Sequence, residues 1–233
     1  MTQTPIPFQT PQQLIARAKA GELVSFPTDT VPALGIRPDR AAQIFAAKQR
    51  STQKPLILMG ARTEDLWPYI DKTDVPRAVL DQWQQLMAQH WPGAVTFVLP
   101  VGTAGHAWAA TLNPENPTTL GLRVPNHTLA RSILQETGPL ATTSANRSGE
   151  PALTNLATIA EAFPQVAVVD PQAGQSGSGQ ASTVVQWRGH GQNQNPTPTT
   201  ASATPAQSTP SAAPASGWVL LRSGAVQLDL PVS

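Results

Sequence analysis

Short apolar runs alternate with helical patterns along most of this 233-residue chain, and that alternation restricts the possible folds more than any other feature. The runs that we expect to form strands are 23–26, 56–59, 94–99, 119–124, 140–143, 166–169, 182–187 and 218–222, with 226–230 as a candidate for a last strand. Strands that alternate with helices are typical of an α/β fold. Because no helical pattern separates the closing strands, part of the sheet should be antiparallel and the sheet mixed.

Capping residues predict where the helices between these strands begin and end. Thr10 is a good N-cap with Pro11 at the first helical position, and Gly21 follows the end of that helix. The N-caps expected for later helices are Asp39, Thr63, Asp74 (with Pro76 behind it) and Asn126, and a further helix is expected over 156–163. An apolar stripe in the helix after Asp74 indicates core packing rather than a cofactor site, and consists of Val79, Leu80, Trp83, Leu86 and Met87.

Three segments are expected to lack regular structure. Residues 1–9 are interpreted as a flexible tail, and the Gly-, Asn- and Pro-rich stretch up to about residue 118 as a loop. Residues 189–216 contain no charged and no large apolar side chain, so they cannot bury enough surface to offset the entropy of ordering. We therefore predict one domain over 10–230, interrupted by a disordered insertion whose deletion is tolerated. A partner-docking role for the insertion is the less favoured alternative.

Composition excludes several classes of protein. A formal net charge of +1 excludes a strongly basic protein, so any nucleic-acid contact would require a local patch. The absence of cysteine excludes disulfides, thiolate catalysis and cysteine-based zinc sites. The four histidines share no metal-ligand spacing, and we assign no metal ligands. We find no signal peptide or transmembrane pattern and expect a cytoplasmic protein without membrane contact.

The stretch 24–55 carries the clearest chemical signal. A strand stops at Pro27 and is followed by the hydroxyl-rich turn from Thr28 to Thr30, at the kind of strand end where ligands bind in α/β sheets. Lys48, Arg50 and Lys54 follow at a helix end. Compensation of the helix dipole is the alternative reading of these cations. A hydroxyl turn beside three cations favours an anionic substrate such as a nucleotide.

Other polar residues interrupt apolar strands farther along the chain. Arg123 and Arg222 each close an apolar run, and buried arginines usually have an anionic partner. A polar cluster from Thr142 to Asn146 follows another strand, although a simple turn or cap would explain it as well. The glycine- and serine-rich run 174–179 lacks the P-loop pattern and is interpreted as a flexible loop rather than a phosphate site. No nucleophile–base pair is evident, so the sequence favours catalysis by positioning and charge neutralisation.

Seven motifs follow one another along the chain, namely FPTDTVPALG (26–35), IFAAKQRSTQKPL (44–56), WPGAVTFVL (91–99), LGLRVPNH (120–127), TTSANRSGEP (142–151), STVV (182–185) and LLRSGAV (220–226). In this order they resemble the YrdC/TsaC family of L-threonylcarbamoyladenylate synthases. The resemblance implies a twisted, mixed parallel and antiparallel sheet with flanking helices. It also implies condensation of L-threonine, bicarbonate and ATP, with Mg²⁺ accompanying ATP, to threonylcarbamoyl-AMP and pyrophosphate for the modification of tRNA.

The resemblance also implies roles for individual residues. The family's catalytic set corresponds to Lys48, Arg50, Ser144 and Asn146. Its threonine-binding positions correspond to Thr30, Arg123 and Ser182. Its positions near ATP correspond to Arg50, Lys54, Thr96, Thr142, Ser144 and Arg222. A tRNA-modifying transferase as partner and contact with double-stranded RNA are further implications, and a non-catalytic RNA-binding paralogue of the same fold is the alternative function.

The chain departs from the family pattern at three places, and the insertion 189–216 separates two of the motifs. Pro32 and Ala33 stand where the family often has Tyr-Gly, so an aromatic wall beside threonine is expected to be missing. Met59 stands where some members have histidine, and Ser223 replaces the usual proline after the last arginine. None of these departures removes a cation from the expected site.

Overall fold

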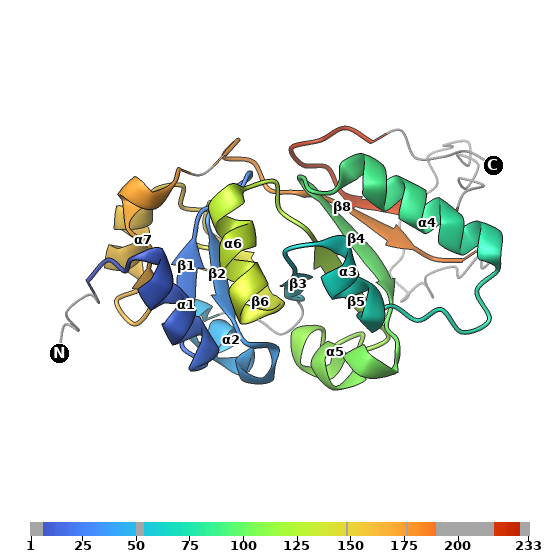
Figure 1. Cartoon of the computed structure of the whole chain (residues 1–233), viewed down its shortest axis with the longest axis horizontal. Helices are drawn as coiled ribbons and strands as arrows, with labels where there is room; N and C mark the ends of the chain where they lie inside the picture. The colour runs from blue at the N-terminus through green and yellow to red at the C-terminus, as the bar shows by residue number, and fades with distance from the viewer. Residues whose placement is uncertain (1–6, 50–53, 148, 176, 190–216, 229–233) are drawn as a thin grey trace, which may run out of the picture.

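A computed structural model describes residues 7–49, 54–147, 149–175, 177–189 and 217–228. Within these residues, a single mixed sheet has the strand order β7-β1-β2-β6-β3-β5-β4-β8-β9 (Figure 1). The strands are β1 Val24–Phe26, β2 Ala33–Ile36, β3 Ile57–Met59, β4 Val95–Pro100, β5 Thr119–Arg123, β6 Leu140–Ser144, β7 Ala167–Val168, β8 Thr183–Trp187 and β9 Trp218–Arg222. The pairs β1–β7, β3–β5 and β4–β8 are parallel and the other pairs are antiparallel. The predicted mixed α/β sheet is therefore confirmed.

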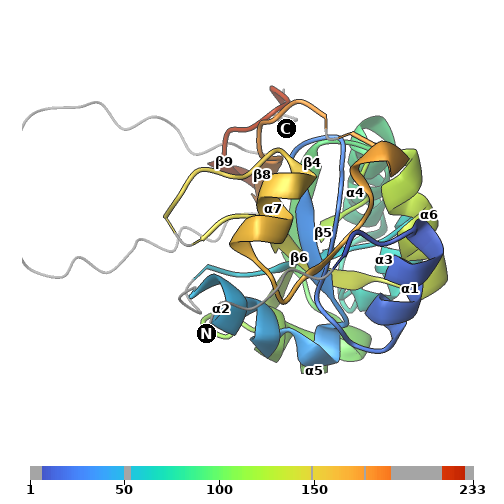
Figure 2. The same cartoon turned by 90° about the vertical axis from the view of Figure 1, so that its left-hand side faces the viewer.

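Helices flank this sheet, and several of them cover the same face. They are α1 Pro11–Lys19, α2 Ala42–Lys48, α3 Thr63–Leu66, α4 Arg77–His90, α5 His106–Leu112, α6 Thr128–Thr137 and α7 Leu156–Ala162. Helices α1, α3, α4 and α6 lie together on one side of the sheet (Figures 1 and 2). The apolar stripe of α4 packs into the core as predicted, with Leu80 only partly buried. The longest helix in the described ranges has 14 residues, and none of them combines the length and the hydropathy of a membrane span.

Local chemistry explains where the first helices begin. Thr10 and Gln13 form a capping box at the start of α1, and Gly21 adopts φ +85° just after its end, as predicted. The prediction for α2 is wrong, because Asp39 lies inside a 3₁₀ turn and its carboxylate pairs with Arg37 at 3.0 Å instead of capping a helix. Helix α2 begins only at Ala42.

Three other helices have their N-cap one or two residues away from the predicted one. Helix α3 has Arg62 before it and Thr63 as its first residue. Helix α4 begins at Arg77, directly after Pro76, while Asp74 lies in a left-handed turn. The cap of α6 is His127 rather than Asn126, and its Nδ1 accepts a hydrogen bond from the Ala130 amide at 3.3 Å. Helix starts in this chain are thus set by the neighbouring turns as much as by side-chain caps.

Two elements were not predicted. Strand β2 contains Gly35, where a side chain would come within 3.0 Å of the ring of Phe26, so a glycine that usually disfavours strands is required by packing. Helix α5 lies in the stretch predicted as loop. It was missed because its seven residues bury only Ala109 and Leu112 and show little apolar periodicity. The candidate strand after β9 is absent over Val226–Leu228, and 229–230 lie outside the described residues.

Gln9, near the start of the described residues, and strand β9, near their end, both pair with outer parts of the sheet. Gln9, in the segment predicted as a tail, is buried and its backbone bonds to Val168 and Asp170 beside β7. Strands β8 and β9 pair antiparallel, with Trp187 opposite Trp218 and the Arg188 amide donating to the Gly217 carbonyl at 2.8 Å. The predicted insertion between them falls on 190–216, outside the described residues.

Candidate active site

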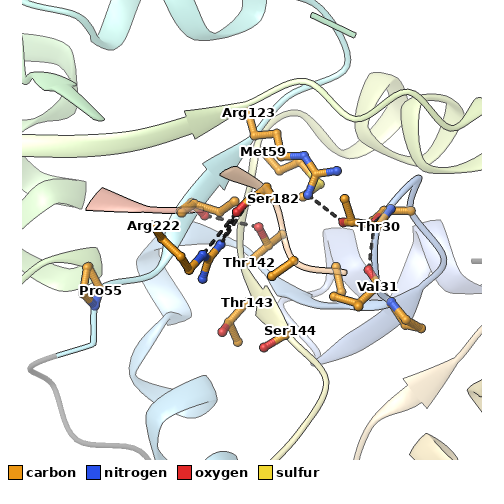
Figure 3. A pocket seen from close by; sticks show the side chains of 15 residues that line it. Thr30, Val31, Pro55, Met59, Arg123, Thr142, Thr143, Ser144, Ser182 and Arg222 are labelled. Atoms are coloured by element: carbon orange, nitrogen blue, oxygen red, sulfur yellow. Dashed lines mark hydrogen bonds between the residues drawn. The ribbon is translucent and has the colours of Figure 1, made fainter. Parts of the chain in front are cut away.

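A half-open cavity lies where loops and strand ends from both halves of the sheet meet (Figure 3). Its volume of about 130 Å³ is roughly ten times what a single buried water needs, so it can admit a small organic molecule. Strand ends of β5, β6 and β9 contribute polar groups, while β2 and β3 contribute apolar ones. The lining residues that carry the argument are Thr28, Thr30, Arg123, Ser144, Ser182 and Arg222.

One wall of the cavity is the loop between β1 and β2, held by a buried ion pair. Arg123 is 3% exposed, and its guanidinium donates to Asp29 Oδ1 at 2.7 Å and to Thr30 Oγ1 at 2.9 Å. Its Nε donates to the Gly93 carbonyl at 3.0 Å. An arginine desolvated in this way is tolerated only because a carboxylate and neutral acceptors satisfy it. The loop is therefore fixed in position and close to neutral in charge.

A glycine-rich segment supports this loop from behind. The amides of Gly177, Ser178 and Gly179 donate in turn to the carbonyls of Thr28, Asp29 and Thr30, at 2.8, 3.1 and 3.0 Å. A Cβ on Gly177 would lie 2.0 Å from the Asp29 carbonyl oxygen, so only glycine permits this approach. The amides of 177–179 are thus used within the protein, so this part of the run predicted as a flexible loop is held against the loop between β1 and β2.

The opposite wall comes from β8 and β9. Arg222 donates through Nε and Nη2 to the Ser182 carbonyl at 3.1 and 2.8 Å, and Nη2 lies 3.2 Å from Ser182 Oγ. Ser182 Oγ also lies 2.9 Å from Thr96 Oγ1, which is fully buried behind it on β4. Within the described part of the chain, no carboxylate pairs with Arg222. This wall therefore presents a positive charge that neutral groups hold in place.

The end of β6 forms a third polar part of the cavity lining, and a buried lysine lies beneath it. Lys48, the last residue of α2, is fully buried, and its Nζ donates to Asn146 Oδ1 at 3.2 Å, to Thr143 Oγ1 at 3.4 Å and to the Ser144 carbonyl. Ser144 Oγ donates to the same Asn146 Oδ1 at 2.6 Å. This connects α2 to the end of β6, where Thr142 and Ser144 line the cavity.

The pKa values of both cavity arginines are lowered. Burial lowers the pKa of Arg123, the Asp29 carboxylate opposes that change, and the positive charge of Arg222 lowers the same pKa further. Partial burial of its guanidinium lowers the pKa of Arg222 as well, although much of the side chain is exposed. Arginine nevertheless stays cationic in proteins. Because Asp29 compensates the charge of Arg123, the net positive charge at the cavity comes from Arg222, and this charge attracts anions.

The family model described as "Telomere recombination", covering Sua5, YciO and YrdC, matches residues 16–196. The chain belongs to the Sua5/YciO/YrdC family. A threonylcarbamoyl-AMP synthase of Vibrio vulnificus is 37% identical over 143 residues, which cover 60% of this chain and 73% of that protein.

The structure of P. abyssi Sua5 complexed with L-threonine has a TM-score of 0.63 at 27% identity, over 78% of this chain and 53% of that one. This chain thus spans about half the length of that Sua5. E. coli YciO has a TM-score of 0.66 at 20% identity over 98% of both chains, which supports the fold alone.

The structure of this family member brings most of the predicted site residues together. Six of them line the cavity, namely Thr30, Arg123, Thr142, Ser144, Ser182 and Arg222. Lys48 and Asn146 connect to it through Ser144, whereas Thr96 lies behind Ser182 and does not line the cavity. Lys54 is exposed beside the lining residue Pro55, and Arg50 lies outside the described residues.

Other residues that line the cavity were not predicted as site residues, or were noted only as departures from the family pattern. Thr28 and Asp29 were seen as part of a polar turn, but only the fold reveals that Asp29 pairs with Arg123, 94 residues away. Val31, Pro55, Ile57 and Ala181 carried no sequence signal, because apolar and small residues in such runs look like ordinary core. Pro32, Ala33 and Met59 do line the cavity, so two of the three departures from the family pattern lie at the site, whereas the third, Ser223, is exposed beside Arg222.

The described residues do not form a metal-binding cluster. No group of three or more His, Cys, Asp or Glu side chains in those ranges could hold an ion. Mg²⁺ in nucleotide sites is usually held by substrate phosphates, waters and one or two carboxylates. The described side chains that line this cavity include hydroxyls and guanidinium groups but no carboxylate.

Proposed function

We propose that this chain condenses L-threonine, bicarbonate and ATP to threonylcarbamoyl-AMP and pyrophosphate, which supplies the threonylcarbamoyl group for tRNA modification. The observation that carries the proposal is a cavity with a neutral, hydrogen-bonded wall opposite a cationic wall, in a chain whose relatives are named threonylcarbamoyl-AMP synthase. The P. abyssi Sua5 structure with L-threonine supports threonine as the amino-acid substrate.

The chemistry needs charge neutralisation more than a general base. The amine of threonine combines with bicarbonate to give a carbamate and water. A carbamate oxygen then attacks the α-phosphorus of ATP, the bond to the β-phosphate oxygen breaks, and pyrophosphate leaves. Both reacting partners are anionic, so their approach is unfavourable until cations offset the repulsion. Positioning of the two substrates supplies much of the remaining rate enhancement.

The geometry supports a division of roles between the walls. We assign Thr30, Arg123 and Ser182 to threonine, and Arg222, Thr142 and Ser144 to the nucleotide. Lys48 and Asn146 act with Ser144 at the end of β6. Thr96 acts through Ser182, because its hydroxyl is buried behind that residue. Arg50 and Lys54 remain proposed nucleotide contacts on the segment that follows α2.

Mg²⁺ is proposed to enter with ATP, and its chemistry there would be to neutralise charge on the phosphates. A transferase that accepts the adenylate, and direct contact with RNA, are further proposals. The functional names of the relatives favour catalysis over a non-catalytic RNA-binding role.

Pyrophosphate release is the direct test. Purified protein supplied with ATP, Mg²⁺, bicarbonate and L-threonine should release pyrophosphate, and omission of threonine or of bicarbonate should stop the release. The product should carry one threonylcarbamoyl group per AMP by mass spectrometry. Release that is independent of threonine, or RNA binding without ATP turnover, would refute the proposal.

A further inference from the structure

Thr28 and Thr30 both line the cavity, two residues apart on one loop, but their hydroxyls differ in what they can offer a ligand. We infer that Thr28 is a positioning residue that fixes the proton of Thr30, so that Thr30 presents only an acceptor to the substrate. Thr30 would then bind an amine or hydroxyl donor of the amino acid and disfavour a carboxylate or phosphate oxygen. This inference rests on the proposed function and adds to it the orientation of the amino acid.

The hydrogen bonds of Thr28 use the full capacity of its hydroxyl. A threonine hydroxyl has one proton to donate and two lone pairs. The proton of Thr28 goes to the Val31 carbonyl at 2.8 Å. Its oxygen accepts from the Thr30 amide at 3.2 Å and lies 3.0 Å from Thr30 Oγ1. Since the proton of Thr28 is already used, the bond between the two hydroxyls must be donated by Thr30.

That assignment determines what remains at Thr30. Its proton points back to Thr28, and one of its lone pairs accepts from Arg123 Nη1 at 2.9 Å. One lone pair is left, on a side chain that is 1% exposed and faces the cavity. A carboxylate or phosphate oxygen placed there would meet a lone pair instead of a proton, and a buried mismatch of this kind is costly.

The wall formed by β8 and β9 offers the substrate a hydrogen-bond donor, whereas Thr30 offers an acceptor. Thr96 is fully buried with Ser182 Oγ as its hydrogen-bond partner, so its proton is satisfied only if Thr96 donates. Ser182 Oγ then accepts from both Thr96 and Arg222, and its own proton is left for the cavity. Thr30 and Arg222 lie on opposite sides of the cavity (Figure 3). A zwitterionic amino acid is thus oriented with a donor group at Thr30 and its carboxylate towards the Ser182 hydroxyl.

The test compares Thr28→Val, which is close in shape but lacks the hydroxyl, with Thr28→Ser, which retains it. In Thr28→Val the Thr30 proton loses its acceptor and can turn into the cavity. We expect KM for L-threonine to rise roughly tenfold, as for an unmatched buried hydrogen bond, while KM for ATP stays within about twofold. Thr28→Ser should restore the wild-type value. Thr119→Val, which removes a half-buried hydroxyl at the other end of β5, should change neither KM.

Direct titration with L-threonine and with L-2-aminobutyrate, which lacks the hydroxyl, identifies the donor. If the substrate hydroxyl binds Thr30, only the threonine affinity falls in Thr28→Val; if the amine does, both affinities fall alike. An unchanged KM for threonine in Thr28→Val, an equal rise for ATP, or failure of Thr28→Ser to restore binding would overturn the inference. Failure of the proposed function is seen separately, because the wild-type protein would then lack threonine-dependent pyrophosphate release.

Discussion

The two walls of the cavity each contain an arginine at the end of a strand, yet they are built differently. Arg123 is buried and paired with Asp29, and its loop is fixed by the backbone of 177–179. Arg222 ends β9, an outer strand of the sheet, is partly exposed, and is held by the Ser182 carbonyl and hydroxyl. Arg123 therefore holds its loop in place as well as lining the cavity, whereas Arg222 contributes net positive charge.

This difference suits the two substrates of the proposed reaction. A zwitterionic amino acid needs a rigid site with matched donors and acceptors, and the Arg123 wall supplies these with its charge already compensated. A nucleotide carries several negative charges, which an uncompensated cation at the mouth of the cavity attracts. Substitutions of Arg123 and its loop should therefore affect stability and threonine use together, whereas substitution of Arg222 should affect mainly the nucleotide.

Arg123→Met should have the largest effect. It leaves the Asp29 carboxylate, 14% exposed, without its partner, and it removes the donor to Thr30. We expect the free energy of unfolding to fall by about 3 kcal/mol and threonine-dependent pyrophosphate release to fall at least about a hundredfold. Chemical denaturation and the pyrophosphate assay measure the two effects.

The double variant Asp29→Asn, Arg123→Met is the control for this prediction. Removing the stranded charge should recover more than half of the lost stability, because the cost arises from the unpaired carboxylate. Activity should stay low, since the donor to Thr30 is still missing. Equal stability of Arg123→Met and the wild type would show that the ion pair does not hold this wall.

Gly177→Ala should have an intermediate effect. Its new Cβ would overlap the Asp29 carbonyl, so the loop must move away from residues 177–179. We expect a loss of about 1–3 kcal/mol of stability, typical of overpacking, and a rise in KM for threonine that exceeds any rise for ATP. Gly174→Ala is the matched control in the same segment, because its nearest contact would be 3.2 Å from the His127 ring. If the two variants behave alike, close support of the loop is not important.

The sequence predicted most strands because their apolar runs are bounded by proline or glycine, and it predicted α1 because Thr10, Pro11 and Gly21 act locally. It missed β2, since Gly35 is explained only by the ring of Phe26 on the neighbouring strand. It placed Asp39 at a helix cap, whereas the carboxylate pairs with Arg37. Contacts between strands thus escape a local pattern, and Asp39 shows that two local interactions can also compete for one side chain.

The candidate site was likewise predicted only where single residues or short segments carry a signal. Charged and hydroxyl residues at strand ends stood out, and six of the predicted ones line the cavity. The pairing of Asp29 with Arg123 and the backbone support from Gly177 join segments 94 and about 150 residues apart, and no local pattern encodes them. Thr96 was assigned to a ligand, but the sheet places it behind Ser182, where it can act only through that residue.

Arg222→Gln should have the smallest effect on stability and the most selective effect on activity. Its side chain is exposed and bonded to neutral groups, so the free energy of unfolding should change by less than about 1 kcal/mol. Loss of its charge should raise KM for ATP roughly tenfold or more and leave KM for threonine less affected. Because exposed charges are screened, the difference from the wild type should shrink as salt is raised.

Arg188→Gln is the matched control, since it removes the same charge from the other end of the β8–β9 hairpin. It should leave both KM values unchanged. A rise in KM for ATP of the same size in both variants would mean that the overall charge of the hairpin, rather than the Arg222 guanidinium at the cavity, attracts the nucleotide. A rise in KM for threonine without one for ATP in Arg222→Gln would reverse the assignment of the two walls.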